Sequence, residues 1–127
     1  MSFTQAIRTV FSKYFRMAGR AGKAEFWWFV LLWFIVDVVL SAARSAFDDT
    51  TFPGAIIMLV LGIIALLLII PMITVGVRRL HDVGRSGWWM WLHFIPLIGT
   101  IVLIIFWVGE SQGPNQYGPG PEPAVAA

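Results

Sequence analysis

Residues 54–77 form an uninterrupted run of 24 residues without a charged side chain. The hydrocarbon core of a bilayer is about 30 Å thick and needs about 20 apolar residues at about 1.5 Å each. Residues 26–43 contain one charge, Asp37, and residues 88–108 contain no Asp, Glu, Lys or Arg. All three stretches are too long, and alternate too little, for barrel strands. The sequence therefore predicts an all-α integral membrane protein with three transmembrane helices.

The composition agrees with this fold class. Hydrophobic residues make up 58% of the 127 residues and charged residues only 13%, against about 25% charged in soluble domains. This excludes an ordinary soluble domain, a disordered chain and a coiled coil. The absence of cysteine excludes disulfides, thiolate metal sites and cysteine nucleophiles.

The distribution of Lys and Arg predicts the orientation. The segments before, between and after the three stretches carry five, one, three and no basic residues. Because short cytoplasmic segments are enriched in Lys and Arg, we expect the N-terminus in the cytoplasm and the C-terminus outside. Two alternatives stay open. Pro96 and Gly99 would allow the third stretch to form a re-entrant hairpin with a cytoplasmic tail, and small residues at 41–43 would allow the first stretch to be a cleaved signal peptide.

The two ends of the chain have different characters. Within the cytoplasmic segment 1–25, apolar residues recur at helical spacing over residues 3–15 between basic ones. This pattern predicts an amphipathic helix in the plane of an anionic leaflet, started by a capping box of Ser2 and Gln5. The tail, residues 109–127, is rich in Pro and Gly, and we expect it to be disordered after about residue 120.

Polar groups inside the predicted spans should share one level of the bilayer. Asp37 lies about 16 Å deep, Thr100 about 18 Å, and the Leu67 carbonyl, which Pro71 deprives of its helical donor, about 15 Å. An ionised Asp at that depth costs about 2.5–3.5 kcal/mol. We expect a hydrogen-bonded cluster of these groups, with a proton or ion relay as the alternative.

His93 lies about 8 Å deep, at the level of Thr74, and is expected to make a structural hydrogen bond. His81 and His93 are twelve residues apart without a paired carboxylate. Neither a metal site nor a cofactor site is therefore predicted.

Two polar clusters are expected at the cytoplasmic ends of the spans. Their excess of positive charge beside tryptophans suits a phosphate headgroup, and ion pairs between the helices are the alternative. Asp82 is also spaced to pair locally with Arg78 and Arg85, and Glu25 to meet Arg78 or Arg79. The candidate residues are Arg20, Lys23, Glu25, Arg78, Arg79, His81, Asp82, Arg85, Trp88 and Trp89.

Catalytic and nucleotide-binding motifs are absent from the sequence. There is no glycine-rich phosphate loop, no Gly-x-Ser-x-Gly and no HExxH, and the adjacent His81 and Asp82 are too little for a catalytic pair. We expect no enzyme and no nucleic-acid partner.

Four motifs carry a resemblance to a known family. The pattern Gly-Arg-x-x-Lys-x-Glu-Phe-Trp-x-Phe at residues 19–29 is followed by related runs at residues 78–89, 95–99 and 115–119. In this order they resemble the bacterial inner-membrane family known as domain of unknown function 805, although Lys23 stands where that family often has Arg. The resemblance implies a small integral inner-membrane protein and supplies no reaction.

These observations together predict a non-enzymatic module that binds anionic phospholipid or a membrane-protein partner through the cytoplasmic Arg and Trp clusters. A component of a small-solute or ion transporter that uses Asp37 and the Pro-broken helices is the first alternative. A membrane-embedded enzyme is the second.

Overall fold

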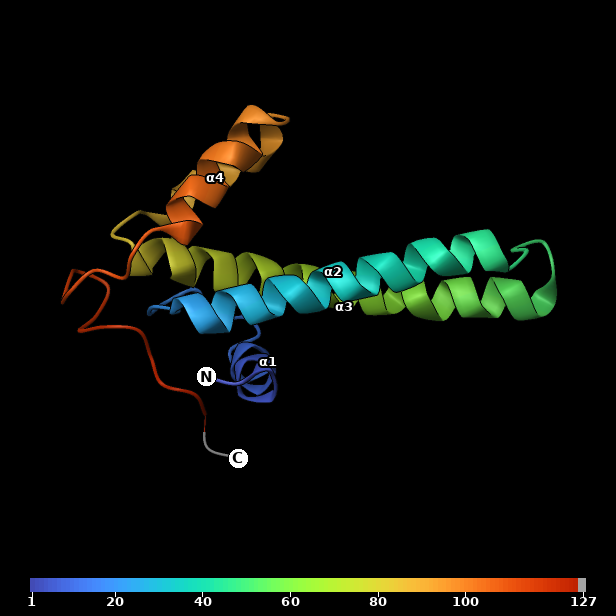
Figure 1. The fold of residues 1–127 in the computed structure, drawn as a ribbon, viewed down its shortest axis with the longest axis horizontal. Helices are drawn as coiled ribbons and strands as arrows, with labels where there is room; N and C mark the ends of the chain where they lie inside the picture. The colour runs from blue at the N-terminus through green and yellow to red at the C-terminus, as the bar shows by residue number, and fades with distance from the viewer. Residues whose placement is uncertain (126–127) are drawn as a thin grey trace.

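Two long antiparallel helices, joined by a short loop, run the length of the molecule in a computed structural model that describes residues 1–125 (Figure 1). No strand occurs among these residues, so the all-helical fold class is confirmed. Beside the long pair, a short helix crosses one end and a helical hairpin projects from the same end. The elements are α1 (Phe3–Ser12), α2 (Lys23–Ala46), α3 (Phe52–Asp82), the 3-10 helix η1 (Gly87–Phe94) and α4 (Ile98–Val108).

Local sequence explains where the helices begin. The predicted capping box is present, because the Ser2 hydroxyl accepts from the Gln5 amide and the Gln5 side chain accepts from the Ser2 amide. Thr51 caps α3 by accepting a hydrogen bond from the Gly54 amide at 3.3 Å, with a proline in the first turn, where its missing N–H is harmless.

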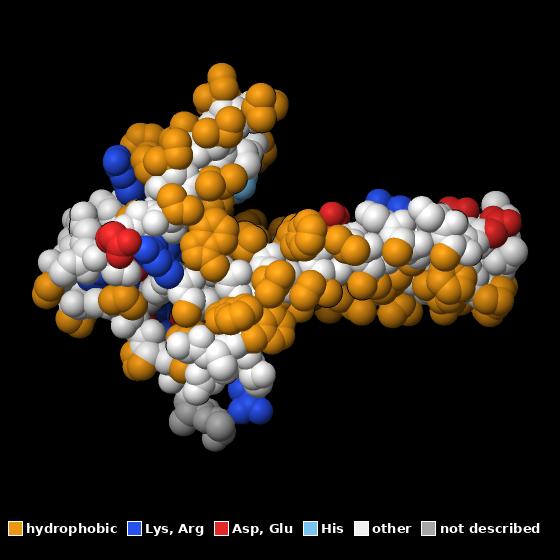
Figure 2. All heavy atoms as spheres, viewed as in Figure 1, with side chains coloured by type: hydrophobic (Ala, Val, Ile, Leu, Met, Phe, Trp, Pro, Cys, Tyr) orange, Lys and Arg blue, Asp and Glu red, His pale blue; other side chains and the backbone are white. Residues whose placement is uncertain are grey.

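Two helices are long and apolar enough to cross a membrane, α2 and α3. Exposed apolar side chains run along α2 from Trp28 to the cap residue Phe47, and along α3 from Phe52 to Ile73, as the orange surface of the rod in Figure 2 shows. These sections measure about 30 Å and about 33 Å at 1.5 Å per residue, which matches the hydrocarbon core. Both helices extend beyond the predicted spans 26–43 and 54–77.

The third apolar stretch is not the continuous helix expected over residues 88–108. It forms η1 and α4, which fold back on each other into a hairpin (Figure 1). Pro96 disfavours a helical conformation of the residue before it, and Leu97 has a positive φ of 64°, so the chain turns there. A Cβ at Gly99 would lie 1.6 Å from the Leu92 carbonyl oxygen, so glycine permits the close return. At 11 residues, α4 is about 16 Å long, too short to span alone.

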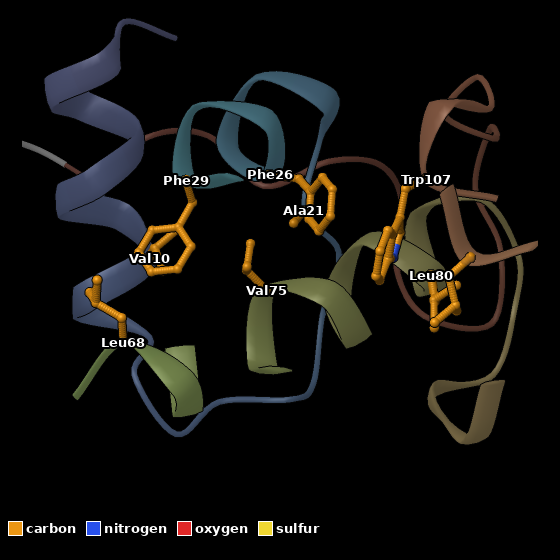
Figure 3. Packing of buried hydrophobic residues seen from close by; sticks show 9 residues of the cluster. Val10, Ala21, Phe26, Phe29, Leu68, Val75, Leu80 and Trp107 are labelled. Atoms are coloured by element: carbon orange, nitrogen blue, oxygen red, sulfur yellow. The ribbon is translucent and has the colours of Figure 1, made fainter. Parts of the chain in front are cut away.

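Buried apolar residues gather where α2 begins and α3 ends (Figure 3). Beyond Ile73, nearly every residue of α3 up to Asp82 is buried, because α1, the base of the hairpin and the tail surround it. We call this assembly, residues 1–29, 74–85 and 103–125, the juxtamembrane core. Its buried apolar members include Val10, Ala21, Phe26, Phe29, Val75, Leu80, Leu103 and Trp107.

The tail follows the surface of the juxtamembrane core. Glu122 bonds Lys13 at 2.7 Å, and the Val125 amide donates to the Thr9 hydroxyl at 3.1 Å. Residues 121–125 are thus tied to α1, in contrast to the disorder expected after residue 120. For residues 126–127 the expectation of disorder falls outside the described part of the chain.

Candidate functional site

Arg20 joins three segments of the chain at the centre of the juxtamembrane core. It is fully buried, and its Nε donates to Asp82 Oδ1 at 2.9 Å. Its Nη1 donates to the carbonyls of Gly113 and Gly118, both at 2.9 Å, and its Nη2 donates to the carbonyl of Gln112 at 2.5 Å. Arginine suits this position because its planar fork offers five donors. The guanidinium therefore organises the tail around the end of α3.

Arg79 makes the matching connection to the hairpin. It too is fully buried, and its Nη1 donates to Asp82 Oδ2 at 2.5 Å. Its Nε donates to the Trp107 carbonyl at 3.0 Å and its Nη2 to the Gly109 carbonyl at 2.5 Å, at the end of α4. The Ser111 hydroxyl also donates to Asp82 Oδ2. Asp82 is thus the shared acceptor for two buried arginines and the tail.

Arg78 pairs with Glu25 across α2 and α3, and both side chains are fully buried. Arg78 and Arg79 were the two partners expected for Glu25, and the structure pairs it with Arg78. Among the described residues, Arg78 Nε and Nη2 and Glu25 Oε1 have no hydrogen-bond partner. This pair is therefore less completely satisfied than the Arg20 and Arg79 contacts, which use three nitrogens each.

The buried arginines change the interpretation of the predicted headgroup cluster. The local pairing expected for Asp82 with Arg78 and Arg85 is replaced by pairing with Arg20 and Arg79. A charge without solvent exposure needs partners inside the protein, and these arginines find them in carboxylates and carbonyls. They are not accessible to a lipid headgroup.

Other members of the cluster face outward. Lys23 reaches Glu110 at 2.5 Å on the surface. The Arg85 guanidinium lies 4.3 Å from the centre of the Phe106 ring and 5.6 Å from that of Trp89. Trp88 and Trp89 are both exposed, as residues of a membrane-interface belt would be.

His81 and Tyr117 form a stacked pair with ring centres 4.0 Å apart and planes inclined by 3°. His81 Nδ1 lies 3.0 Å from the Gly19 carbonyl oxygen, and the Asn115 side chain donates to the His81 carbonyl at 3.0 Å. This pair brings the tail motif against the end of α3. The contact places the tail motif at the same end of the molecule as Arg20.

The stacked pair lines an open groove between α3 and η1. The groove has a volume of about 740 Å³, within the range of about 300–1,000 Å³ typical of small-molecule sites. Sequence reasoning missed it, because it depends on the hairpin folding back beside α3. The lining residues are Met17, Ile73, Val77, His81, Ser86, Gly87, Trp88, Met90, Trp91, His93, Phe94 and Tyr117.

The intramembrane polar residues do not form the expected cluster. The Leu67 carbonyl accepts a hydrogen bond from the Tyr14 hydroxyl at 2.6 Å. Asp37 is exposed on α2 beside a cavity of about 50 Å³, and neither Asp37 nor Thr100 has a side-chain hydrogen bond within residues 1–125. Thr100 lies on α4, and α4 packs on α3 and η1, away from this level of α2.

His93 does not bond Thr74, whose hydroxyl donates to the Tyr14 carbonyl at 3.1 Å. The centre of the His93 ring lies 5.7 Å from the centre of the Trp107 ring, and His93 lines the groove. Within the described part of the chain, no group of three or more His, Cys, Asp or Glu side chains could hold a metal ion.

Comparison with known proteins identifies relatives over nearly the whole chain. Residues 14–119 match a family model described as a protein of unknown function, DUF805. The chain is 32% identical to inner membrane protein YhaI of Escherichia coli K12, across 90% of this chain and 92% of that protein. It is 35% identical to inner membrane protein YhaH of the same organism, across 89% and 93% respectively. No solved structure matches the chain.

Proposed function

The chain belongs to the DUF805 family of inner membrane proteins, and from this premise we propose that it is a non-enzymatic lipid-binding protein of the bacterial inner membrane. The groove between α3 and η1 holds the apolar part of a membrane lipid. The buried arginines hold the wall of that groove together instead of binding the lipid themselves.

The proposed topology places both termini in the cytoplasm. Five basic residues before α2 and three between residues 78 and 85 favour a cytoplasmic juxtamembrane core. The bonds from Arg20 to the carbonyls of Gly113 and Gly118 hold the tail at that same end. The η1–α4 hairpin then enters the cytoplasmic leaflet and returns, so α2 and α3 are the two spans.

The observation that carries the lipid-binding proposal is the position of the groove. Its lining on α3 runs from Ile73 to His81, about 12 Å along the helix. Ile73 is the last exposed apolar residue of the spanning part of α3, so the groove begins at the edge of the hydrocarbon core. Its walls are mainly aromatic and aliphatic, which favours a chain entering from the bilayer.

Anionic phospholipid has a separate place in this proposal. Arg8 on α1 and Arg85 before η1 are exposed, and each basic residue near an anionic surface contributes about 1 kcal/mol of attraction. These residues would hold the juxtamembrane core against the leaflet. Binding of anionic lipid is therefore proposed for this outer surface, not for the buried arginine cluster.

The test compares two isoleucines one helical turn apart. Ile73 and Ile69 are 39% and 40% exposed, and of the two only Ile73 lines the groove. Lipid retained after detergent extraction is measured by native mass spectrometry. We expect Ile73→Trp to lose a lipid that the parent and Ile69→Trp retain. Equal retention by all three proteins would contradict the groove as the binding site.

A further inference from the structure

Several polar atoms in the groove have no hydrogen-bond partner among residues 1–125, including ring atoms of His93 and two atoms of the stacked pair His81 and Tyr117. His81 Nε2 lies 3.7 Å from the position of a Cβ built on the groove residue Gly87, and His81 has its hydrogen bond through Nδ1. Tyr117 lines the same groove. Its backbone amide donates to Asn115, and its hydroxyl has no hydrogen-bond partner among the described residues. Polar groups in an apolar site fix the orientation of a ligand.

The hydrogen-bond geometry fixes which tautomer His81 adopts when neutral. A carbonyl oxygen only accepts hydrogen bonds, so the contact with the Gly19 oxygen at 3.0 Å places the proton on Nδ1. Nε2 of the neutral ring is then an acceptor. The Tyr117 ring, stacked at 4.0 Å, holds the imidazole plane in place. A ligand atom that meets Nε2 must therefore be a hydrogen-bond donor.

The groove offers no charge for an ionic headgroup. Its lining contains no Asp, Glu, Lys or Arg, and Arg20 is fully buried with its donors occupied. A phosphate moved into such surroundings loses its hydration without gaining a cation, which is strongly unfavourable. An uncharged head with a hydroxyl group fits both the lining and the His81 acceptor.

We infer that the lipid bound in the groove is an uncharged glycerolipid with a free hydroxyl, of the diacylglycerol type, which rests on the lipid-binding function proposed above. The glycerol hydroxyl donates to His81 Nε2 and accepts from the Tyr117 hydroxyl. The acyl chains pass along Ile73 into the bilayer, so that the hydroxyl end lies at the level of the juxtamembrane core.

The test uses dioleoylglycerol and its 3-O-methyl ether, which share the same chains and differ in the hydroxyl donor. Both are added at equal concentration to the full-length protein in mixed micelles, and retention is measured by native mass spectrometry. An acceptor left unpaired in an apolar site lowers affinity by about tenfold, so we expect about a tenfold preference for the alcohol. His81→Phe, which keeps an aromatic ring against Tyr117, should bind both lipids equally.

Each other outcome has a distinct meaning. Equal retention of alcohol and ether by the parent overturns the hydroxyl inference and leaves the lipid groove intact. Retention of neither, with Ile73→Trp unchanged from the parent, overturns the proposed function as well. Displacement of dioleoylglycerol by equimolar phosphatidylglycerol overturns the uncharged head. If His81→Phe does not fold, Tyr117→Phe keeps the ring and removes the hydroxyl that donates to the lipid oxygen. It should lower the retention of alcohol and ether alike, and unchanged retention of both would overturn the Tyr117 contact.

Discussion

Arg20 donates to Asp82 over 2.9 Å although 62 residues separate them in the sequence and neither side chain is exposed. The same carboxylate accepts from Arg79 at 2.5 Å. One acidic residue therefore holds the entry to α2, the end of α3 and, through the arginines' carbonyl contacts, the tail and the hairpin. Groups that share one acceptor in this way should respond to its removal together.

Asp82→Asn should destabilise the fold by about 3–5 kcal/mol, because it leaves two buried guanidinium groups without a carboxylate. The unfolding free energy can be measured by titration with sodium dodecyl sulfate in mixed micelles. Asp49→Asn, an exposed change in the α2–α3 loop, is the control and should stay within about 0.5 kcal/mol of the parent. Equal stability of the two variants would contradict the central role of Asp82.

Replacement by lysine should lower the unfolding free energy less at Arg78 than at Arg20. Arg78 uses one nitrogen, on Glu25, whereas Arg20 uses three on Asp82 and the tail carbonyls. Each hydrogen bond to a charged group contributes about 1.5–3 kcal/mol, and a lysine ammonium lacks the planar fork. We expect Arg20→Lys to cost at least about 3 kcal/mol and Arg78→Lys less than half of that, in the same titration. The reverse order would show that carbonyl contacts matter less than the Glu25 pair.

The sequence predicted the parts of the fold that depend on local patterns. Long apolar stretches identified α2 and α3, and the Ser2 and Gln5 side chains identified the start of α1. The third stretch has the same apolar length, and its interruption at Pro96 admitted two structures. Composition could not choose between them, because a hairpin and a span bury the same residues in lipid. The structure has the hairpin, with the carbonyls of Gly113 and Gly109 bonded to Arg20 and Arg79.

The candidate site was predictable by residue type but not by partner. Arg20, Arg78, Arg79, Glu25 and Asp82 are all prominent in the sequence. Which carboxylate meets which arginine depends on the rotation of α2 and α3 and on the path of residues 109–125. Backbone carbonyl acceptors such as that of Gly113 cannot be recognised from residue type, because every residue has one. The groove arises only from the packing of η1 beside α3.

Fusions to the C-terminus test the topology. With both termini in the cytoplasm, a C-terminal green fluorescent protein should fluoresce and a C-terminal alkaline phosphatase should be inactive. Alkaline phosphatase fused after Asp49, in the loop between α2 and α3, should be active and serves as the positive control. An active phosphatase at the C-terminus would instead support three spans and separate the tail from Arg20.

Asp37→Leu should leave the stability of the isolated chain unchanged within about 0.5 kcal/mol, because the carboxyl is exposed on α2 and bonds no other described residue. If the Asp37 carboxyl did make a hydrogen bond inside the membrane, its removal would cost about 0.6 kcal/mol on average. A larger loss for Asp37→Leu than for Asp37→Asn in the detergent titration would show that this carboxyl makes a hydrogen bond, either to a second copy of the chain or within the chain itself. Repeating the titration at lower protein concentration separates self-association from a response within the chain.

Acid should release the tail from α1, because Glu122 ties the tail to Lys13 and Arg16. Partial burial opposes ionisation of Glu122, but the hydrogen bond and charge of Lys13, with the charge of Arg16, outweigh it and lower its pKa below the ordinary value of 4.5. A lowered pKa stabilises the docked tail at pH values above 4.5, and this stabilisation is lost as the pH falls through the pKa of the docked state. The pH window of release therefore lies below 4.5.

Because the chain has no cysteine, a nitroxide on Ala124→Cys reports the release directly through its mobility. We expect the label to be restrained at pH 7 and to become mobile below pH 4.5. Glu122→Gln should increase the mobility at pH 7 and remove the acid response, since the amide carries no charge to lose. Glu110→Gln is the matched control, because its partner Lys23 lies on the surface and does not hold the tail to α1. An acid response that persists in Glu122→Gln would place the titrating group elsewhere in the juxtamembrane core.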